Sequence, residues 1–342
     1  MIKVEGLTKE FIRKGRDGKA VRKLAVDGLS FEIGRGEIFG LLGPNGAGKT
    51  TTIRMLTMQT EKSAGRIWYD GMPLEGNEKA IKEMIGIVPQ HINFDNDLSV
   101  GYNMELHGRL HHMDSMDRKQ RIEELLRYIE LEDTVNMPPR QLSGGMKRRL
   151  LIARALIHRP KILFMDEPTV ALDPQVRRRI WDLIREMAAN GVTVLLTTHY
   201  IEEAESLCNR VAIINKGRLV DIDTPASFCQ RMGRIAVEWK GTAESGTDMK
   251  GGRAAEGGCA KGDAGGSSAG ALHESSRQYR FFDSRQEAAE FMAAQELEEA
   301  KMRRSNLEDV FIELTGRREG LCCSCRIFGR CSGGTGLCCT GD

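Results

Sequence analysis

The sequence has no long run of apolar residues. No window approaches the ~18 to 20 apolar residues that a membrane-spanning helix needs, and residues 1–7 lack the apolar core of a secretory signal. These absences argue against an integral membrane protein. From them we expect a soluble chain that stays in the cytosol.

The chain also has no excess of one charge and few cysteines in its body. Its 342 residues carry 50 Lys and Arg against 48 Asp and Glu, a net charge of +2. Because the basic residues are spread along the chain, no basic footprint points to nucleic acid as a partner. Of nine cysteines, only Cys208, Cys229 and Cys259 precede residue 322. The body therefore fits a reducing compartment, and the length predicts about two domains.

One glycine-rich segment, residues 43–50, has the composition of a phosphate-binding loop. Its residues are Gly43, Pro44, Asn45, Gly46, Ala47, Gly48, Lys49 and Thr50. It follows a short apolar strand and opens a helix that continues through Thr51, the order that G-x-x-x-x-G-K-[ST] requires. Backbone N–H groups and the helix N-terminus can then converge on one anion. We expect Lys49 to neutralise the β- and γ-phosphates and the Thr50 hydroxyl to complete a magnesium shell.

Three further predicted strands run into polar residues. One leads to Gln90, one to the adjacent acids Asp166 and Glu167, and one to His199. Sheets of this class bind ligands at the carboxyl ends of their strands. We expect Asp166 to hold the magnesium shell through water and Glu167 to orient or deprotonate the attacking water. The convergence of polar strand ends favours a functional role for His199.

A second glycine-containing segment opens another helix at residues 141–150. Ser143, Gly144 and Gly145 can form a second anion-binding nest, although a purely structural N-cap is an equal alternative. The basic run at 147–149 is predicted to form a solvated face of this helix.

The region between the two glycine-rich segments, about 91–140, has helical periodicity. One predicted face carries Tyr102, Leu106 and Leu110. His107 and His111 lie one turn apart and His112 adjoins them, so a metal pair is one interpretation. Without a carboxylate or thiol at matching spacing, solvent-facing histidines are favoured.

Small regions containing β-strands are predicted over the first 40 residues and over residues 231–318. Short strands over the first 40 residues predict an antiparallel sheet with a hairpin tip at 15–19. Phe11 lies on this sheet, where an aromatic ring either packs in the core or stacks on a purine. Residues 231–318 predict a small α+β domain. Its Gly-, Ala- and Ser-rich stretch at 241–276 has too few apolar residues to offset its ordering entropy, so we expect a disordered insertion.

The last segment, residues 319–342, is rich in cysteine. It contains Cys322, Cys323, Cys325, Cys331, Cys338 and Cys339. A thiolate site for zinc or an iron–sulfur cluster is one interpretation. The spacing matches no C-x2-C pair pattern, which favours a disordered, redox-sensitive tail.

Taken together and in this order, these motifs resemble the nucleotide-binding subunit of an ABC transporter over residues 1 to about 230. The most specific element is Leu142-Ser143-Gly144-Gly145 upstream of Asp166-Glu167, and Ala171-Leu172-Asp173 follows it. The resemblance implies an α/β fold: a P-loop NTPase (ABC ATPase) core with an N-terminal antiparallel β subdomain, an inserted helical subdomain and a small C-terminal α+β appendage.

The resemblance also implies roles for individual residues. Phe11 would stack on adenine, Gln90 would touch magnesium and the attacking water, and His199 would contact the γ-phosphate. Ser143, Gly144 and Gly145 would hold the γ-phosphate bound to the opposite protomer, and Asp173 would join the two sites. Ala171 stands where glycine is commoner in this subgroup, a departure that we expect to cost little.

At the level of function, the resemblance implies an ATPase that uses ATP and Mg2+ and works as a dimer with a second ATP-binding subunit, most simply a homodimer. A separate membrane permease would dock on the helical region and place the chain on the inner face of the cell membrane. The ending at 304–317 resembles the drug-resistance (daunorubicin-resistance type) export group, which implies export of a drug-like or amphipathic small molecule. The alternatives are an import system and a non-transport ABC protein of translation or DNA repair.

Overall fold

The computed structural model describes residues 1–14, 20–240, 254–256, 277–295, 297 and 299–316. The chain divides into two compact units, one ending at Pro225 and the other beginning at Ala226. The predicted hairpin tip at 15–19 and the Cys-rich tail at 319–342 lie outside the described residues.

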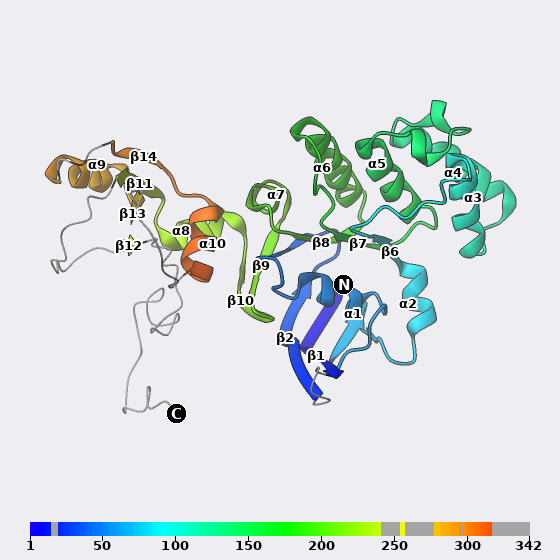
Figure 1. The fold of residues 1–342 in the computed structure, drawn as a ribbon, viewed down its shortest axis with the longest axis horizontal. Helices are drawn as coiled ribbons and strands as arrows, with labels where there is room; N and C mark the ends of the chain where they lie inside the picture. Colours follow the sequence, from blue (N-terminus) through cyan, green and yellow to red (C-terminus); the bar gives the residue numbers. More distant parts are fainter. Residues whose placement is uncertain (15–19, 241–253, 257–276, 296, 298, 317–342) are drawn as a thin grey trace, which may run out of the picture. The chain divides into compact units, whose positions relative to one another are not determined.

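The first unit contains two sheets (Figure 1). A four-stranded antiparallel sheet has the order β2-β1-β4-β5, as predicted for the N-terminus. Its strands are β1 (Ile2–Lys14), β2 (Ala20–Ile33), β4 (Ala64–Tyr69) and β5 (Met72–Pro73). A six-stranded sheet has the order β10-β9-β3-β8-β7-β6, in which only β10 is antiparallel to its neighbour. Its strands are β3 (Ile38–Leu42), β6 (Ile85–Val88), β7 (Ile162–Asp166), β8 (Thr193–Thr198), β9 (Arg210–Asn215) and β10 (Arg218–Asp223).

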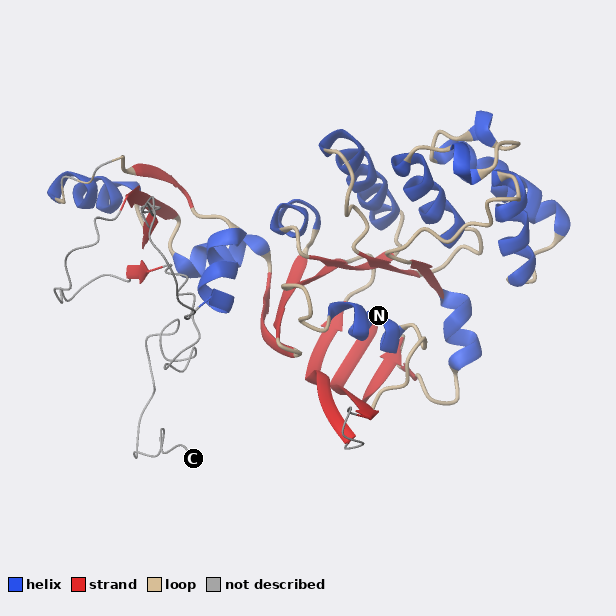
Figure 2. Ribbon diagram, in the orientation of Figure 1, coloured by secondary structure: helices blue, strands red, loops and turns tan. Residues whose placement is uncertain are grey.

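The six-stranded sheet is buried on both faces, which explains its apolar strands. Every residue of β3, β7 and β8 is buried, as expected for parallel strands covered by other layers. Figure 2 shows α5 (Gly144–Ala155), α6 (Pro174–Ala189) and α7 (Ile201–Leu207) over one face. Helix α1 (Lys49–Leu56) and the antiparallel sheet lie on the other face. The core runs between the two sheets, where the rings of Phe31 and Phe39 stack with centroids 5.5 Å apart.

The predicted helical insertion is present and follows α2 (Glu78–Met84) and β6. It comprises α3 (Val100–Leu110), α4 (Ser115–Tyr128) and the short 3-10 helices η1 (Glu132–Thr134) and η2 (Pro139–Gln141). Ile122, Leu125 and Leu126 of α4 are buried, whereas the apolar face of α3 that the sequence identifies is exposed to solvent.

The expectation of solvent-facing histidines is wrong for His107 and His111. The ring of His111 stacks on that of His158 with centroids 3.7 Å apart, and His107 meets His111 edge-on at 5.0 Å. Burial lowers the pKa of His107 and of His158 to about 4 and also lowers the pKa of His111, which favours neutral rings at pH 7. Over the described part of the chain, no group of three or more His, Cys, Asp or Glu could hold a metal ion.

The second unit has the predicted α+β composition. Its antiparallel sheet has the order β12-β13-β11-β14. The elements are α8 (Pro225–Met232), β11 (Ile235–Lys240), β12 (Ala254–Glu256), β13 (Arg277–Phe282), α9 (Arg285–Ala294), β14 (Lys301–Arg304) and α10 (Leu307–Gly316). Strand β12 is the only described part of the stretch at 241–276, which thus supplies a short edge strand absent from our sequence expectation. Asn306 caps α10 reciprocally with Asp309, each side chain accepting from the other's backbone N–H.

No helix among the residues that the structure describes is both long and apolar enough to cross a bilayer.

Candidate functional site

The glycine-rich loop connects β3 to α1 and wraps around the Lys49 side chain. A Cβ on Gly43 would lie 2.3 Å from the Ile214 carbonyl oxygen, so only glycine fits there. Gly48 has a φ of +105° and caps α1. The Lys49 ammonium donates to the carbonyls of Gly43 at 2.7 Å and Pro44 at 3.1 Å and is 5% exposed. This burial lowers the pKa of Lys49 against the opposing effect of Glu167.

Asp166 lies directly beside the first turn of α1. Its Oδ1 accepts from the Thr50 hydroxyl at 3.2 Å and from the Thr197 hydroxyl at 2.6 Å. Thr50 and Asp166, two of the three residues predicted to hold magnesium, are therefore neighbours, although 116 positions separate them in the chain. Thr197, at the end of β8, escaped the sequence prediction. A hydroxyl next to the carboxyl end of a buried parallel strand is the signal that could have found it.

The other polar side chains predicted at strand ends lie around the Glu167 carboxylate. Its Oε2 accepts from the Gln90 amide at 3.2 Å, and its Oε1 lies 3.1 Å from His199 Nδ1 and 3.9 Å from Lys49 Nζ. The carboxylate is 8% exposed. The ends of β6, β7 and β8 and the phosphate loop thus meet at one buried acid, as the strand order requires.

The prediction of a solvated face at 147–149 is wrong for Arg148. This residue is 4% exposed, and burial lowers the pKa of its guanidinium to about 10. Arg149 is partly buried and donates to the Ile129 carbonyl at 2.5 Å. A periodicity signal was available, because Arg148 precedes Leu151 and Ile152 by three and four residues and so shares their buried face.

Other predicted site residues do not join this cluster. Phe11 lies half-buried on β1, with Lys9 Nζ 5.0 Å from its ring centroid. Ser143 caps α5 by accepting from the Met146 N–H at 3.2 Å, and Asp173 stands at the N-cap position of α6. Within the described ranges, no hydrogen bond or ion pair connects these three side chains with the phosphate loop.

Gly144 and Gly145, the first two residues of α5, have different surroundings. A Cβ on Gly144 would meet nothing within 4 Å, whereas one on Gly145 would lie 2.6 Å from Val176 Cγ1. The first turn of α5 is therefore open at Gly144 and closely packed at Gly145.

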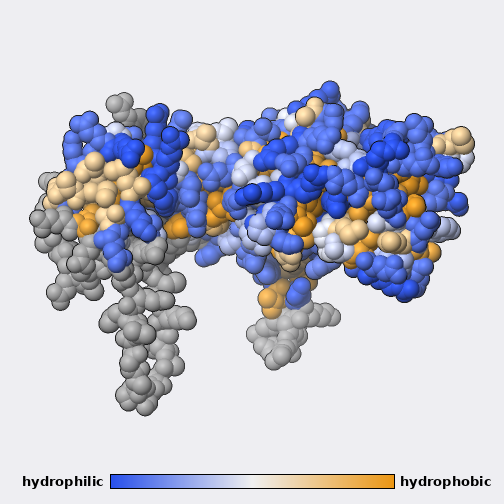
Figure 3. Space-filling model, turned by 90° about the horizontal axis from the view of Figure 1, so that it is seen from above, coloured by the Kyte–Doolittle hydropathy of each residue, from blue (hydrophilic) through white to orange (hydrophobic). Residues whose placement is uncertain are grey.

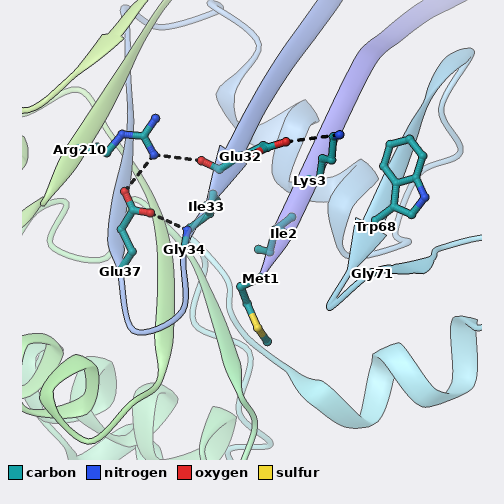
Figure 4. Close-up of a pocket in the computed structure, with 10 residues that line it drawn as sticks. All are labelled: Met1, Ile2, Lys3, Glu32, Ile33, Gly34, Glu37, Trp68, Gly71 and Arg210. Atoms are coloured by element: carbon teal, nitrogen blue, oxygen red, sulfur yellow. Dashed lines mark hydrogen bonds and ion pairs between the residues drawn. The ribbon is translucent and has the colours of Figure 1, made fainter.

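A surface hollow of about 580 Å3 lies at the opposite end of β3 from the phosphate loop (Figure 4). Glu37, which precedes β3, accepts from Gly34 N–H at 2.6 Å and from Arg210 at 3.3 Å. Lys3 pairs with Glu32 at 3.5 Å. The charged groups of the hollow are paired, and it lies at the amino end of β3, whereas the phosphate loop follows the carboxyl end. The hollow is therefore separate from the phosphate loop.

The fold and this cluster define a P-loop ATPase. A family model described as ABC transporter matches residues 26–170. Nod factor export ATP-binding protein I of Paraburkholderia xenovorans is 46% identical over 206 residues, covering 60% of this chain and 68% of that protein. A daunorubicin resistance ATP-binding protein of Streptomyces coeruleorubidus is 44% identical over 198 residues, covering 58% of this chain and 63% of that protein.

Solved structures give the same result. A dimeric bacterial ABC transporter cassette is 30% identical, with a TM-score of 0.59 over 66% of this chain and 98% of that one. A cassette dimer in a post-hydrolysis state, bound to ADP and Pi, is 29% identical with the same TM-score over the same shares. This chain belongs to the family of ABC transporter ATP-binding proteins, and it is an ATPase. The matched region spans about two thirds of the length of its curated relatives.

Ala171, at a position where glycine is commoner, has a strained backbone conformation. Its φ is +58°, in the left-handed region that favours glycine. This conformation costs a non-glycine residue about 1 to 2 kcal/mol. The position explains why glycine is expected there.

We predict opposite effects of two Ala→Gly substitutions. Ala171→Gly relieves the left-handed strain and should raise the free energy of unfolding by up to about 1 kcal/mol, since glycine's larger chain entropy offsets part of the gain. Ala80→Gly, on an exposed position of α2, should lower it by about 1 kcal/mol. Urea unfolding curves measure both. An equal loss in the two variants would show that Ala171 is unstrained.

Proposed function

We propose that this ATPase hydrolyses MgATP at two sites shared by a head-to-tail dimer and powers export of a drug-like or amphipathic small molecule through a separate permease. The observation that carries the hydrolytic part is the meeting of Gln90, His199 and Lys49 at the Glu167 carboxylate. The names of the relatives, Nod factor export and daunorubicin resistance, support export.

The residues present fit a magnesium ion. Thr50 supplies a hydroxyl oxygen, Asp166 a carboxylate, and Gln90 an amide oxygen that is left available because its Nε2 donates to Glu167. Hard oxygen donors of this kind suit Mg2+. Thr50, Asp166 and Gln90 would hold the ion, which would supply positive charge against the negative charge that develops on the phosphates.

The side chains around Glu167 have complementary tasks in hydrolysis. Glu167 orients the attacking water and takes up its proton, and Gln90 holds that carboxylate in place. Lys49 and His199 stabilise charge on the transferring phosphoryl group. Phe11 stacks on the adenine ring, as its position on the antiparallel sheet allows.

The second half of each site comes from the partner. Ser143, Gly144 and Gly145 present backbone N–H groups at the start of α5, and the open space beside Gly144 leaves room for a phosphate. Because no hydrogen bond or ion pair among the described residues connects these groups with the phosphate loop of their own chain, we assign them to the nucleotide of a second copy, with Asp173 joining the two sites. The dimeric state of the similar cassettes supports this arrangement.

The permease would dock on the helical region and hold the chain at the inner face of the cell membrane. Tyr102, Leu106 and Leu110 lie at successive turns of α3 and are 52%, 44% and 67% exposed. Figure 3 shows hydrophobic residues among hydrophilic ones over α3 and α4, at the right of the view. An exposed apolar stripe of this kind marks a protein contact.

Two alternatives keep the ATPase but change its task. An importer would use the same nucleotide site. The names of the relatives and the resemblance of residues 304–317 to the drug-resistance export group favour export over it. A non-transport ABC protein of translation or DNA repair would need a second cassette or a long coiled coil. The described helices between β6 and α5 span 11 and 14 residues, which is too short for such a coiled coil.

Two substitutions should separate binding from hydrolysis. Glu167→Gln should keep the ATP dissociation constant within about 3-fold and lower kcat by at least about 100-fold, because it removes the general base. Lys49→Ala should weaken ATP binding and hydrolysis together, because it removes the charge within the phosphate loop. Titration with a fluorescent nucleotide and a phosphate-release assay measure these effects, and Glu123→Gln at an exposed position of α4 is the control. Near-normal turnover of Glu167→Gln would contradict its assigned role.

Transport direction can be tested in membrane vesicles. The polytopic membrane protein that copurifies with the tagged chain is reconstituted with it, so that the ATPase faces outward. We expect ATP-dependent accumulation of an amphipathic compound inside these vesicles, abolished by Glu167→Gln. Accumulation only with the ATPase facing inward would indicate import. ATP hydrolysis that no membrane protein affects would favour the non-transport alternative.

A further inference from the structure

Arg148 makes an unusual set of contacts for a residue near the start of α5. All five N–H groups of a guanidinium can donate, and here five backbone carbonyls accept. Nε donates to Pro168 at 2.5 Å, and Nη1 donates to Pro89 at 2.7 Å and Gln90 at 3.2 Å. Nη2 donates to Asp166 at 3.3 Å and Glu167 at 2.5 Å.

Four of the five carbonyls belong to two loops at the edge of the six-stranded sheet, and the fifth, that of Asp166, ends β7. One loop follows β6 and carries Gln90, and the other follows β7 and carries Glu167. These neighbouring strands bring the two side chains into contact, with 3.2 Å between Gln90 Nε2 and Glu167 Oε2. The Arg148 side chain therefore fixes the backbone of one loop relative to the other.

The loop at Glu167 needs such support. Glu167 has a φ of +48°, a conformation that residues other than glycine adopt only where surrounding contacts enforce it. Thr197 holds the residue from one side, because its carbonyl and its hydroxyl both lie 3.1 Å from Glu167 N–H. Arg148 holds the opposite end of the same residue through the Glu167 carbonyl. Without these bonds the carboxylate would lose its fixed direction.

The contacts also connect α5 to the hydrolytic residues. Arg148 lies five residues after Ser143, which caps the same helix. A displacement of the start of α5 would therefore be transmitted to the Gln90 and Glu167 backbones through hydrogen bonds of one rigid, planar group.

We propose that Arg148 is a positioning residue for ATP hydrolysis, which holds Gln90 and Glu167 in register and ties their loops to α5, the helix that Ser143 caps. The proposal rests on the role assigned to Glu167. It goes beyond that role in placing part of its control on a side chain that does not touch the nucleotide.

The test compares Arg148→Lys and Arg148→Gln with Arg149→Lys in the full chain. Lysine keeps the charge but offers three donors on a flexible stem, so the two loops lose their fixed separation. We expect kcat to fall by about 10- to 100-fold, because a small misplacement of the reacting groups lowers the rate by this order. KM and the ATP dissociation constant should stay within about 3-fold. Arg149→Lys, whose arginine bonds the Ile129 carbonyl instead, should stay within about 2-fold of the wild type.

A double-variant cycle distinguishes positioning from stability. If Arg148 acts through Glu167, adding Arg148→Lys to Glu167→Gln should not lower the single-turnover rate further. A full additional loss in the double variant would overturn the proposal, and so would unchanged kcat in both Arg148 variants. Urea unfolding gives the folded fraction of each chain. If the decrease in folded fraction accounts for the whole loss of kcat, Arg148 acts on stability alone, and this result would also overturn the proposal.

The hydrolytic role of Glu167 and the positioning role of Arg148 can be disproved separately. Normal turnover of Glu167→Gln alone would remove the proposed hydrolytic role. A normal Arg148→Lys beside an inactive Glu167→Gln would remove only the inference about Arg148.

Discussion

The architecture of this site depends on a buried carboxylate, that of Glu167, at the carboxyl end of β7. Burying such a charge is costly unless donors or cations surround it. Here Gln90, His199 and Lys49 come to it from three other segments of the chain. Those segments can meet only because β6, β7, β8 and β3 are parallel and adjacent, so that their ends share one edge. The strand order thus brings together the donors and the cation that compensate the buried charge of Glu167.

On the proposed function, the chain by itself would hold an incomplete site. The phosphate loop, Asp166 and Glu167 are gathered at the sheet edge, whereas Ser143 and its glycines stand at the start of α5. Arg148 connects these two regions through backbone carbonyls. A nucleotide held between two copies would therefore be sensed by the hydrolytic residues of both, which gives a physical basis for coupling between the sites.

Much of this could be predicted from the sequence, because the informative features are local. A glycine-rich turn between a strand and a helix and polar residues at the ends of apolar strands each occupy a few consecutive positions. Arg148 was missed because a basic triplet resembles a solvated face, and its five acceptors come from segments 18 to 59 residues away. The histidine stack was missed for the same reason, since His158 lies far along the chain from His107 and His111. The strain at Ala171 was underestimated, because its backbone conformation follows from the tertiary path of the loop.

The central claim, that each nucleotide site is shared between two chains, is tested most directly by mixing two inactive variants. Lys49→Ala removes the phosphate loop lysine, and Ser143→Arg blocks the start of α5. Each alone should be inactive. An equal mixture forms heterodimers with one intact site, so about a quarter of the wild-type ATPase rate should return if the chains pair at random and the sites act independently. Wild-type hydrolysis by the Ser143→Arg chain alone would contradict the shared site.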